Sequence, residues 1–311
     1  MIPHFKIAAA GLVLSAVLIG GGCSKAQESS APSTTAPAAN ADVTRFKIGS
    51  LEAIALRDGG LTVPNDNKVL GVGRTPEDVA AVLTGAGLPG DQISLSIQPL
   101  LIRDGDRLVL IDTGAGAAFG PVGGKLPASL AAAGIAPDEI TDILISHSHG
   151  DHVGGLVNAS GALAFPRATI RMAAAEWTFM QANAELKSIV DVITPRVETF
   201  APGAEVAPGI TAIAIEGHTP GHSGYEIVSG TERLLYAGDA MHHSVVSVQH
   251  PEWKILFDDN APVATASREA LDARAADGHT RLYFVHFPYP GLGHITRTGD
   301  VYRWVPEIPA S

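Results

Sequence analysis

Short apolar runs recur along the chain between residues 46 and 287, separated by glycine, proline and acidic residues. They are rich in Val, Ile and Leu and bounded by turn-forming residues, which is typical of buried strands. The predicted strand regions are FKIGSLEAIAL (46–56), ISLSIQPLLI (93–102), RLVLID (107–112), TDILIS (141–146), ITAIAI (210–215), RLLYAG (233–238) and RLYFVHF (281–287).

Four segments between these runs have the pattern of helices. The first, residues 76–87, opens with Pro76, carries acidic residues in its first turn and closes at a glycine. The others span residues 125–134, 173–183 and 263–278. Strands mixed with helices in this way predict a layered α/β domain, which we place at residues 45–311.

The N-terminal residues have a different composition. Lys6 precedes the apolar stretch AAAGLVLSAVLIGGG, which is too short for a comfortable membrane span, so residues 1–22 are predicted to be a signal peptide. Residues 23–44 consist mainly of Ala, Ser, Thr and Pro. Such a segment buries too little apolar surface to offset the entropy of ordering it, so we interpret it as a flexible tether.

Cys23 is the only cysteine and directly follows three glycines. This arrangement resembles a bacterial lipoprotein signal, in which the cysteine becomes the lipidated N-terminus; an ordinary signal peptide is the alternative interpretation. Both predict an exported protein, either periplasmic or lipid-anchored at the cell envelope. A single cysteine also allows no intrachain disulfide, so a metal site in the domain has to use His, Asp or Glu.

The charge balance narrows the range of partners. The formal net charge is −11, whereas an extended nucleic-acid surface needs clustered Lys and Arg. We therefore expect a small-molecule substrate and no nucleic acid, with membrane contact only through a lipid anchor at Cys23.

The sequence SHSHGDH (146–152) follows the predicted strand at 141–146 directly. It places His147, His149, Asp151 and His152 on a loop that glycines allow to turn sharply. A histidine-rich turn is one interpretation and a metal site is the other. The H-x-H-x-D-H pattern arises by chance on the order of once in a thousand chains of this composition, which favours the metal site.

One loop cannot complete two metal coordination shells, so further ligands have to come from elsewhere in the chain. His222 in EGHTPGHSGYEI, Asp239 in LLYAGDA and His286 in RLYFVHF all lie near the ends of predicted strands. Each is weak by itself, because a buried histidine or a Gly-Asp turn is common. Their order along the chain makes the pattern informative.

In that order, these residues resemble the metallo-β-lactamase superfamily over roughly residues 45–305. The resemblance implies a four-layer αβ/βα sandwich of two mixed β-sheets. It implies two divalent ions, most simply zinc, with manganese, cobalt or iron as alternatives. It implies His147, His149 and His222 on one ion and Asp151, His152 and His286 on the other. Asp239 would bridge them, and Asp112 in LVLIDTG would orient the ligands.

Within the superfamily, several groups fit poorly. Two-zinc β-lactamases carry Cys or Ser where this chain has Asp239, and the helical domain of glyoxalase II-type enzymes has no counterpart after His286. The segments IDTGAGAAFGPVGGKLPASLAAAGI, SHSHGDHVGGL, HTPGHS, GDAMHHSVVSVQHPEW and HFPYPGLGHI resemble methyl parathion hydrolase and related lactonases and arylesterases.

That resemblance implies hydrolysis of an ester, lactone or phosphotriester by a hydroxide that bridges two metal ions, with Asp151 and Asp239 as catalytic residues. It also implies a homodimer. An acyl-homoserine lactone lactonase and a non-catalytic zinc-binding surface lipoprotein are the alternative interpretations.

Residues that contact substrate are harder to identify from the sequence. We expect Phe119, Trp177, His242 and His294 to line the pocket, although Trp177 and Met180 are also spaced like the buried face of a helix. The remaining histidines are interpreted as residues that do not bind metal: His218, His243, His250 and His279.

Overall fold

The computed structural model describes residues 41–308. The predicted signal peptide, Cys23 and most of the predicted tether lie outside these residues. Strand β1 (Val43–Ile48) begins inside the predicted tether, so the last two residues of that segment, 43 and 44, belong to the strand. Within residues 41–308, none of the helices combines the length and the apolar character that crossing a membrane requires.

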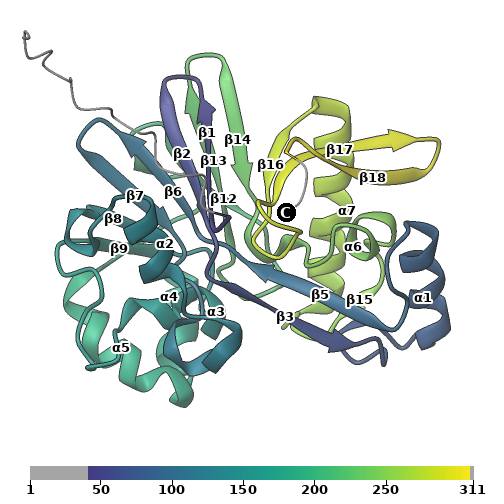
Figure 1. Ribbon diagram of the computed structural model, residues 1–311, viewed down its shortest axis with the longest axis horizontal. Coiled ribbons are helices and arrows are strands. Elements are labelled where there is room, and N and C mark those ends of the chain that lie inside the picture. Colours follow the sequence, from purple (N-terminus) through teal and green to yellow (C-terminus); the bar gives the residue numbers. More distant parts are fainter. Residues whose placement is uncertain (1–40, 309–311) are drawn as a thin grey trace, which may run out of the picture. The chain divides into compact units, whose positions relative to one another are not determined.

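Two seven-stranded sheets form the centre of the domain (Figure 1). In spatial order, the first sheet contains β1, β2 (Leu51–Leu56), β6 (Leu100–Asp104), β7 (Arg107–Ile111), β8 (Asp142–Leu144), β9 (Thr169–Ala173) and β10 (Val197–Phe200). The second contains β11 (Glu205–Ala207), β12 (Ile210–Ala214), β13 (Ser223–Ser229), β14 (Glu232–Tyr236), β16 (Arg281–Tyr283), β17 (Leu292–Thr298) and β18 (Val301–Pro306).

Both sheets are mixed. In the first, β7, β8, β9 and β10 run parallel and the other neighbours are antiparallel. In the second, the β14–β16 pair is parallel. Two smaller pairs complete the strands: β3 (Gly59–Pro64) with β5 (Gln92–Ile97), and β4 (Leu70–Val72) with β15 (Lys254–Ile255).

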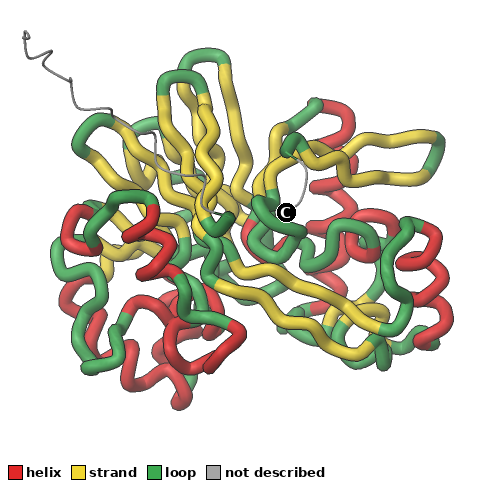
Figure 2. The backbone as a smooth tube through the Cα atoms, viewed as in Figure 1, coloured by secondary structure: helices red, strands yellow, loops and turns green. Residues whose placement is uncertain are grey.

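Helices pack on the outer face of each large sheet and beside the two small strand pairs (Figure 2). They are α1 (Pro76–Gly85), α2 (Leu126–Ala132), α3 (Gly150–Val153), α4 (Ala174–Ala182), α5 (Lys187–Ile193), α6 (Val246–Gln249) and α7 (Ala261–Gly278). All four predicted helices are present. The other three helices were not predicted, and neither were the strands β3, β4, β9, β10, β11, β13, β15, β17 and β18, because these elements are short or carry mixed polar and apolar residues without a long apolar run.

The apolar side chains divide into layers that follow the strand alternation. On β7, Val109 and Ile111 point into the core between the two sheets. Leu108 and Leu110 alternate with them and pack under α2 and α4, on the outer face of the first sheet. A separate core lies between the second sheet and α7 and includes Leu271. The predicted four-layer α/β sandwich of two mixed sheets is therefore confirmed.

Helix α7 buries a carboxyl group inside the outer core. The Asp272 side chain is fully buried and finds no hydrogen-bond partner among the described residues. Burial raises the pKa of Asp272 to about 8, although nearby Arg268 partly opposes that shift. The folded protein then binds more protons than the unfolded chain between about pH 4 and pH 8, so Asp272 makes stability fall as pH rises through that range.

Replacing Asp272→Asn is expected to remove this part of the pH dependence. The variant should gain stability relative to the wild type between pH 5 and pH 8, by about 2 kcal/mol or more at the upper end. Urea unfolding at both pH values measures the difference. Asp277→Asn, at an exposed position on the same helix, is the matched control. An identical pH dependence in wild type and Asp272→Asn would contradict the assignment.

Candidate metal centre

The loop 145–149 leaves β8 at the edge of the first sheet and leads into α3. Its path is held by Asp112, which directly follows β7. Asp112 accepts hydrogen bonds from the Ser146 backbone nitrogen at 2.8 Å and from Ser146 Oγ at 2.7 Å. The neighbouring parallel strands β7 and β8 thus place the predicted orienting carboxylate beside the predicted ligand loop.

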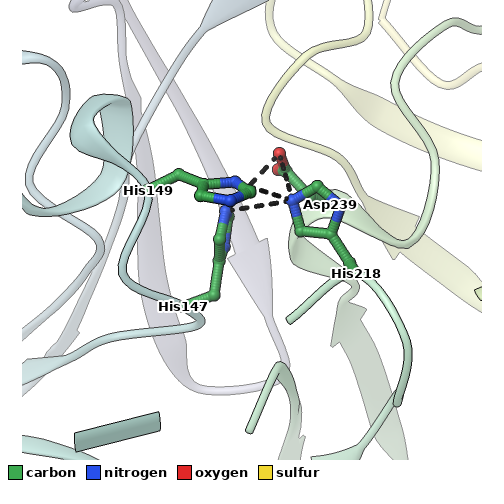
Figure 3. Close-up of side chains that lie close together, drawn as sticks. All are labelled: His147, His149, His218 and Asp239. Atoms are coloured by element: carbon green, nitrogen blue, oxygen red, sulfur yellow. Dashed lines mark hydrogen bonds and ion pairs between the residues drawn. The ribbon is translucent and has the colours of Figure 1, made fainter. Parts of the chain in front are cut away.

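Histidine and aspartate side chains converge beside this loop. Within each of three groups, the potential ligand atoms lie within 4.8 Å of one another. The groups are His147, His149, His218 and Asp239; Asp151, His152 and His286; and Asp239, His242 and His286. The first group is drawn in Figure 3, where three imidazoles and one carboxylate point toward a common centre. Six of the seven predicted ligands are brought together.

Asp239 belongs to the first and third groups, and its carboxylate also lies close to the second. Its Oδ2 is 3.7 Å from His147 Nε2 and 3.0 Å from His286 Nε2, and its Oδ1 is 3.2 Å from His152 Nε2. One carboxylate therefore faces imidazoles of both groups, as a bridging ligand has to.

The structure does not bring His222 to the cluster, and this prediction was wrong. The Nδ1 of His222 donates to the Ile215 carbonyl at 2.9 Å, and its Nε2 accepts from the Asp239 backbone nitrogen at 2.9 Å. Both ring nitrogens are thereby used. His218, interpreted as a residue that does not bind metal, occupies the place instead, with Nε2 3.2 Å from His147 Nε2 and 3.5 Å from Asp239 Oδ2.

The two histidines lie four residues apart in one turn between β12 and β13. Ser223 N donates to Ser146 O at 2.9 Å, which fastens the His222 end of the turn to the first sheet and leaves His218 facing the cluster. Nothing in the sequence of EGHTPGHS distinguishes these two orientations.

Hydrogen bonds at the Nδ1 atoms direct the Nε2 lone pairs into the cluster. His152 Nδ1 donates to Asp112 Oδ2 at 2.8 Å, and His286 Nδ1 donates to the Ser96 carbonyl at 2.7 Å. His147 Nδ1 lies 3.1 Å from Ser146 Oγ, which itself donates to Asp112 and so accepts from the ring. Partners of this kind fix the tautomer and the ring orientation of a metal ligand.

The charges and unsatisfied atoms of the cluster fit divalent cations. The buried atoms His152 Nε2 and Asp239 Oδ1 find no hydrogen-bond partner among the described residues. Burial lowers the pKa of His147 well below its ordinary value, so the ring is neutral with a free lone pair. Burial opposes ionisation of Asp239, but the surrounding histidines outweigh it and hold its pKa well below the usual range. Burial also lowers the pKa of His152 and His286, but the Asp239 carboxylate and other nearby acids outweigh burial and raise both, so these rings lose a proton when they bind a metal ion. Neutral imidazoles and ionised carboxylates are the ligands that zinc and similar ions take.

Glu176 on α4 was missed by the sequence analysis. It is fully buried and accepts from Ser148 N at 2.7 Å, from Thr219 Oγ1 at 2.6 Å and from Gly221 N at 3.0 Å. Glu176 therefore joins the loop of His147 and His149 to the turn that carries His218. An acidic residue in the first turn of a helix is ordinary, so its sequence context gave no signal.

A cavity of about 270 Å³ opens onto the cluster, where it meets Asp151, Asp239 and His286. Its other lining residues are Leu61, Leu95, Phe119, His149, Gly150, His242 and Phe257. Phe119 and His242 line this cavity as predicted; whether they bind substrate stays a prediction.

Two predicted pocket residues lie elsewhere. Trp177 packs against the core between the first sheet and its helices, because its helical spacing with Met180 serves packing. His294 lies on β17 with 38% of its side chain exposed and its Nε2 3.8 Å from Glu307. Neither residue lines the cavity, so both predictions were wrong.

The chain matches the family described as the metallo-beta-lactamase superfamily over residues 96–286, and it belongs to that superfamily. It is accordingly a metal-dependent hydrolase. No curated protein sequence matches the chain.

Solved structures agree with this assignment. One is AidC, a dizinc quorum-quenching lactonase, solved in complex with a product, N-hexanoyl-L-homoserine. Its sequence is 29% identical to this chain, the alignment covers 86% of this chain and 98% of AidC, and the TM-score is 0.82. The hydrolase AbOPH of the beta-lactamase superfamily is 27% identical, with coverages of 88% and 100% and a TM-score of 0.79. A probable metal-dependent hydrolase from Staphylococcus aureus, 21% identical with coverages of 86% and 100% and a TM-score of 0.70, shares the fold. The dizinc relative and the His/Asp groups together support a dinuclear metal centre.

Because His218 and not His222 lies with the ligands, alanine substitutions of the two histidines should have different effects. His218→Ala should lower the number of tightly bound zinc ions from about two to about one per chain. His222→Ala leaves the ligand atoms in place, so the ion count should stay at about two while stability falls by about 1–3 kcal/mol through two lost buried hydrogen bonds. Elemental analysis and urea unfolding give the two readouts. Loss of zinc from His222→Ala alone would reverse the assignment.

Proposed function

We propose that the chain hydrolyses lactones and related carboxylic esters that carry an apolar arm. The observation that carries the proposal is the cavity: one end reaches the cluster at Asp151, Asp239 and His286, and its walls include Leu61, Leu95, Phe119 and Phe257. A purely structural zinc site is closed by protein, whereas this one is open to a small molecule.

His147, His149 and His218 would hold one ion, and Asp151, His152 and His286 the other, with Asp239 shared between them. Zinc is the proposed metal. Two such ions supply Lewis acidity toward a substrate oxygen and generate hydroxide from water near neutral pH. The protein's part is to hold seven ligands in fixed orientations through Asp112, Glu176 and the Ser96 carbonyl.

Asp151 and His242 are the proposed polar groups for the reacting end of the substrate. The Asp151 carboxylate is 18% exposed, more than the Asp239 carboxylate, and lines the cavity. There it can take a proton from the attacking water and pass it to the oxygen of the departing alcohol. The two ring nitrogens of His242 are buried and make no hydrogen bond among the described residues, with Nε2 lying 3.2 Å from Asp239 Oδ2. Its ring faces the same cavity, so His242 is placed to donate a hydrogen bond to a substrate oxygen.

N-acyl homoserine lactones fit this chemistry, since they join a lactone to an apolar acyl chain. The likeness to AidC, whose structure holds N-hexanoyl-L-homoserine, supports this class. Aryl esters and dimethyl phosphotriesters present a similar electrophile beside an apolar group, so the same centre can act on them as secondary substrates.

A substrate panel on the zinc-loaded enzyme tests the proposal. We expect the highest kcat/KM for N-hexanoyl homoserine lactone, lower values for simple lactones and aryl esters, and the lowest for a dimethyl phosphotriester and a cephalosporin. Asp239→Asn should lower each of these by more than about 100-fold with the fold retained, since it weakens the carboxylate shared by both ions. A folded Asp239→Asn variant with full activity, or a phosphotriester as the best substrate, would contradict the proposal.

The apolar walls predict a specific effect on long-chain substrates. Phe257→Ala should raise KM for N-hexanoyl homoserine lactone by roughly 5–30-fold, as expected from about 1–2 kcal/mol of lost apolar burial, and should leave KM for γ-butyrolactone nearly unchanged. Leu88→Ala is the control, because Leu88 is equally exposed but does not line the cavity. Steady-state kinetics measure both. An equal change for the two lactones would show that Phe257 does not contact the acyl chain.

A further inference from the structure

The segment 256–260, between β15 and α7, contacts two histidines of the metal centre, His218 and His242. Phe257 lines the cavity and packs its ring 5.7 Å from that of His242. The next residue, Asp258, has a fully buried side chain that lies against His218. Asp259 N donates to the His218 carbonyl at 3.0 Å, so the segment also holds the backbone of this histidine.

Asp258 divides its two oxygens between two partners. Oδ1 lies 3.0 Å from His218 Nδ1, and Oδ2 accepts from Arg268 Nη1 at 2.7 Å. Arg268 is buried as well and also donates to the carbonyls of Pro251 at 3.0 Å and Trp253 at 3.3 Å. The arginine compensates the buried carboxylate and fastens it to α7, so Asp258 Oδ1 has a fixed position.

Asp258 makes the same kind of contact in one ligand group that Asp112 makes in the other. In the group Asp151, His152 and His286, the Asp112 carboxylate accepts a hydrogen bond from His152 Nδ1. In the group His147, His149 and His218, the Asp258 carboxylate accepts one from His218 Nδ1. A carboxylate at Nδ1 keeps the proton there, which leaves the Nε2 lone pair of His218 directed at His147 and His149.

We infer that Asp258, held by Arg268, is a positioning residue that sets the affinity of one of the two ions, the one held by His147, His149 and His218. This inference rests on the dinuclear centre of the proposed function. It predicts an effect on one ion only, because Asp258 has no contact with Asp151, His152 or His286. A merely structural ion pair would affect folding and leave the two affinities alike.

Metal titration of the full-length protein with Co²⁺, followed by its visible absorption bands and by chelator competition, tests the inference. Asp258→Asn should weaken one ion by about 10–100-fold and leave the other unchanged. The bands of the ion that remains should match those of His218→Ala and differ from those of His286→Ala. Asp259→Asn, at the neighbouring exposed position, is the matched control and should bind both ions as the wild type does.

The outcomes separate the inference from the function on which it rests. Fewer than two ions in the wild type would overturn the dinuclear centre itself. Two ions in the wild type and unchanged or equally weakened affinities in folded Asp258→Asn would overturn only the role of Asp258. If circular dichroism shows that Asp258→Asn does not fold, Asp258→Glu keeps the charge and displaces the oxygen. That variant should show the same selective weakening, and equal affinities in it would overturn the inference.

Discussion

Four hydrogen-bond donors converge on the buried carboxylate of Asp112, and the metal centre depends on that convergence. The donors are Ser146 N, Ser146 Oγ, His152 Nδ1 and, at 2.6 Å, the hydroxyl of Tyr236. Tyr236 ends β14 of the second sheet, whereas Asp112 follows β7 of the first. A buried charge is tolerated only when it is fully paired, so Asp112 forces the two sheets and the ligand loop into one arrangement.

The same principle operates around the whole cluster. Carboxylates from three separate parts of the chain, Asp112, Glu176 and Asp258, stand behind the ligand loops and remove their rotational freedom. Imidazoles that point lone pairs at one another repel unless a cation lies between them. Metal binding would therefore offset the electrostatic repulsion between these imidazoles, so the stability of this region should depend on the bound ions.

The metal ligands and the apolar walls of the cavity come from different segments of the chain. The ligands come from loops and from the short helix α3, which connect strands of the two central sheets. The apolar walls of the cavity come from β3, β5, the glycine-rich loop with Phe119 and the segment with Phe257, which lie outside those sheets. Two of these outer segments also orient metal ligands, because the Ser96 carbonyl of β5 accepts from His286 and Asp258 lies against His218. Changes confined to the apolar side chains of the walls are therefore the ones that can alter the substrate without disturbing the metal centre.

Apolar periodicity in the sequence by itself determined four helices and nine of the strands, because such periodicity is a local property of the chain. The fold class and six of the seven converging ligands followed from the family resemblance carried by SHSHGDH and by the order of Asp239 and His286 after it. The resemblance of the segments that carry Phe119 and His242 also placed these two residues near the site. Only the tertiary structure decided between His218 and His222, excluded Trp177 and His294 from the cavity, and revealed Glu176 and Asp258. Those outcomes depend on which face of a turn or helix meets another segment more than 25 residues away, and contacts of that kind leave no periodic trace in a single sequence.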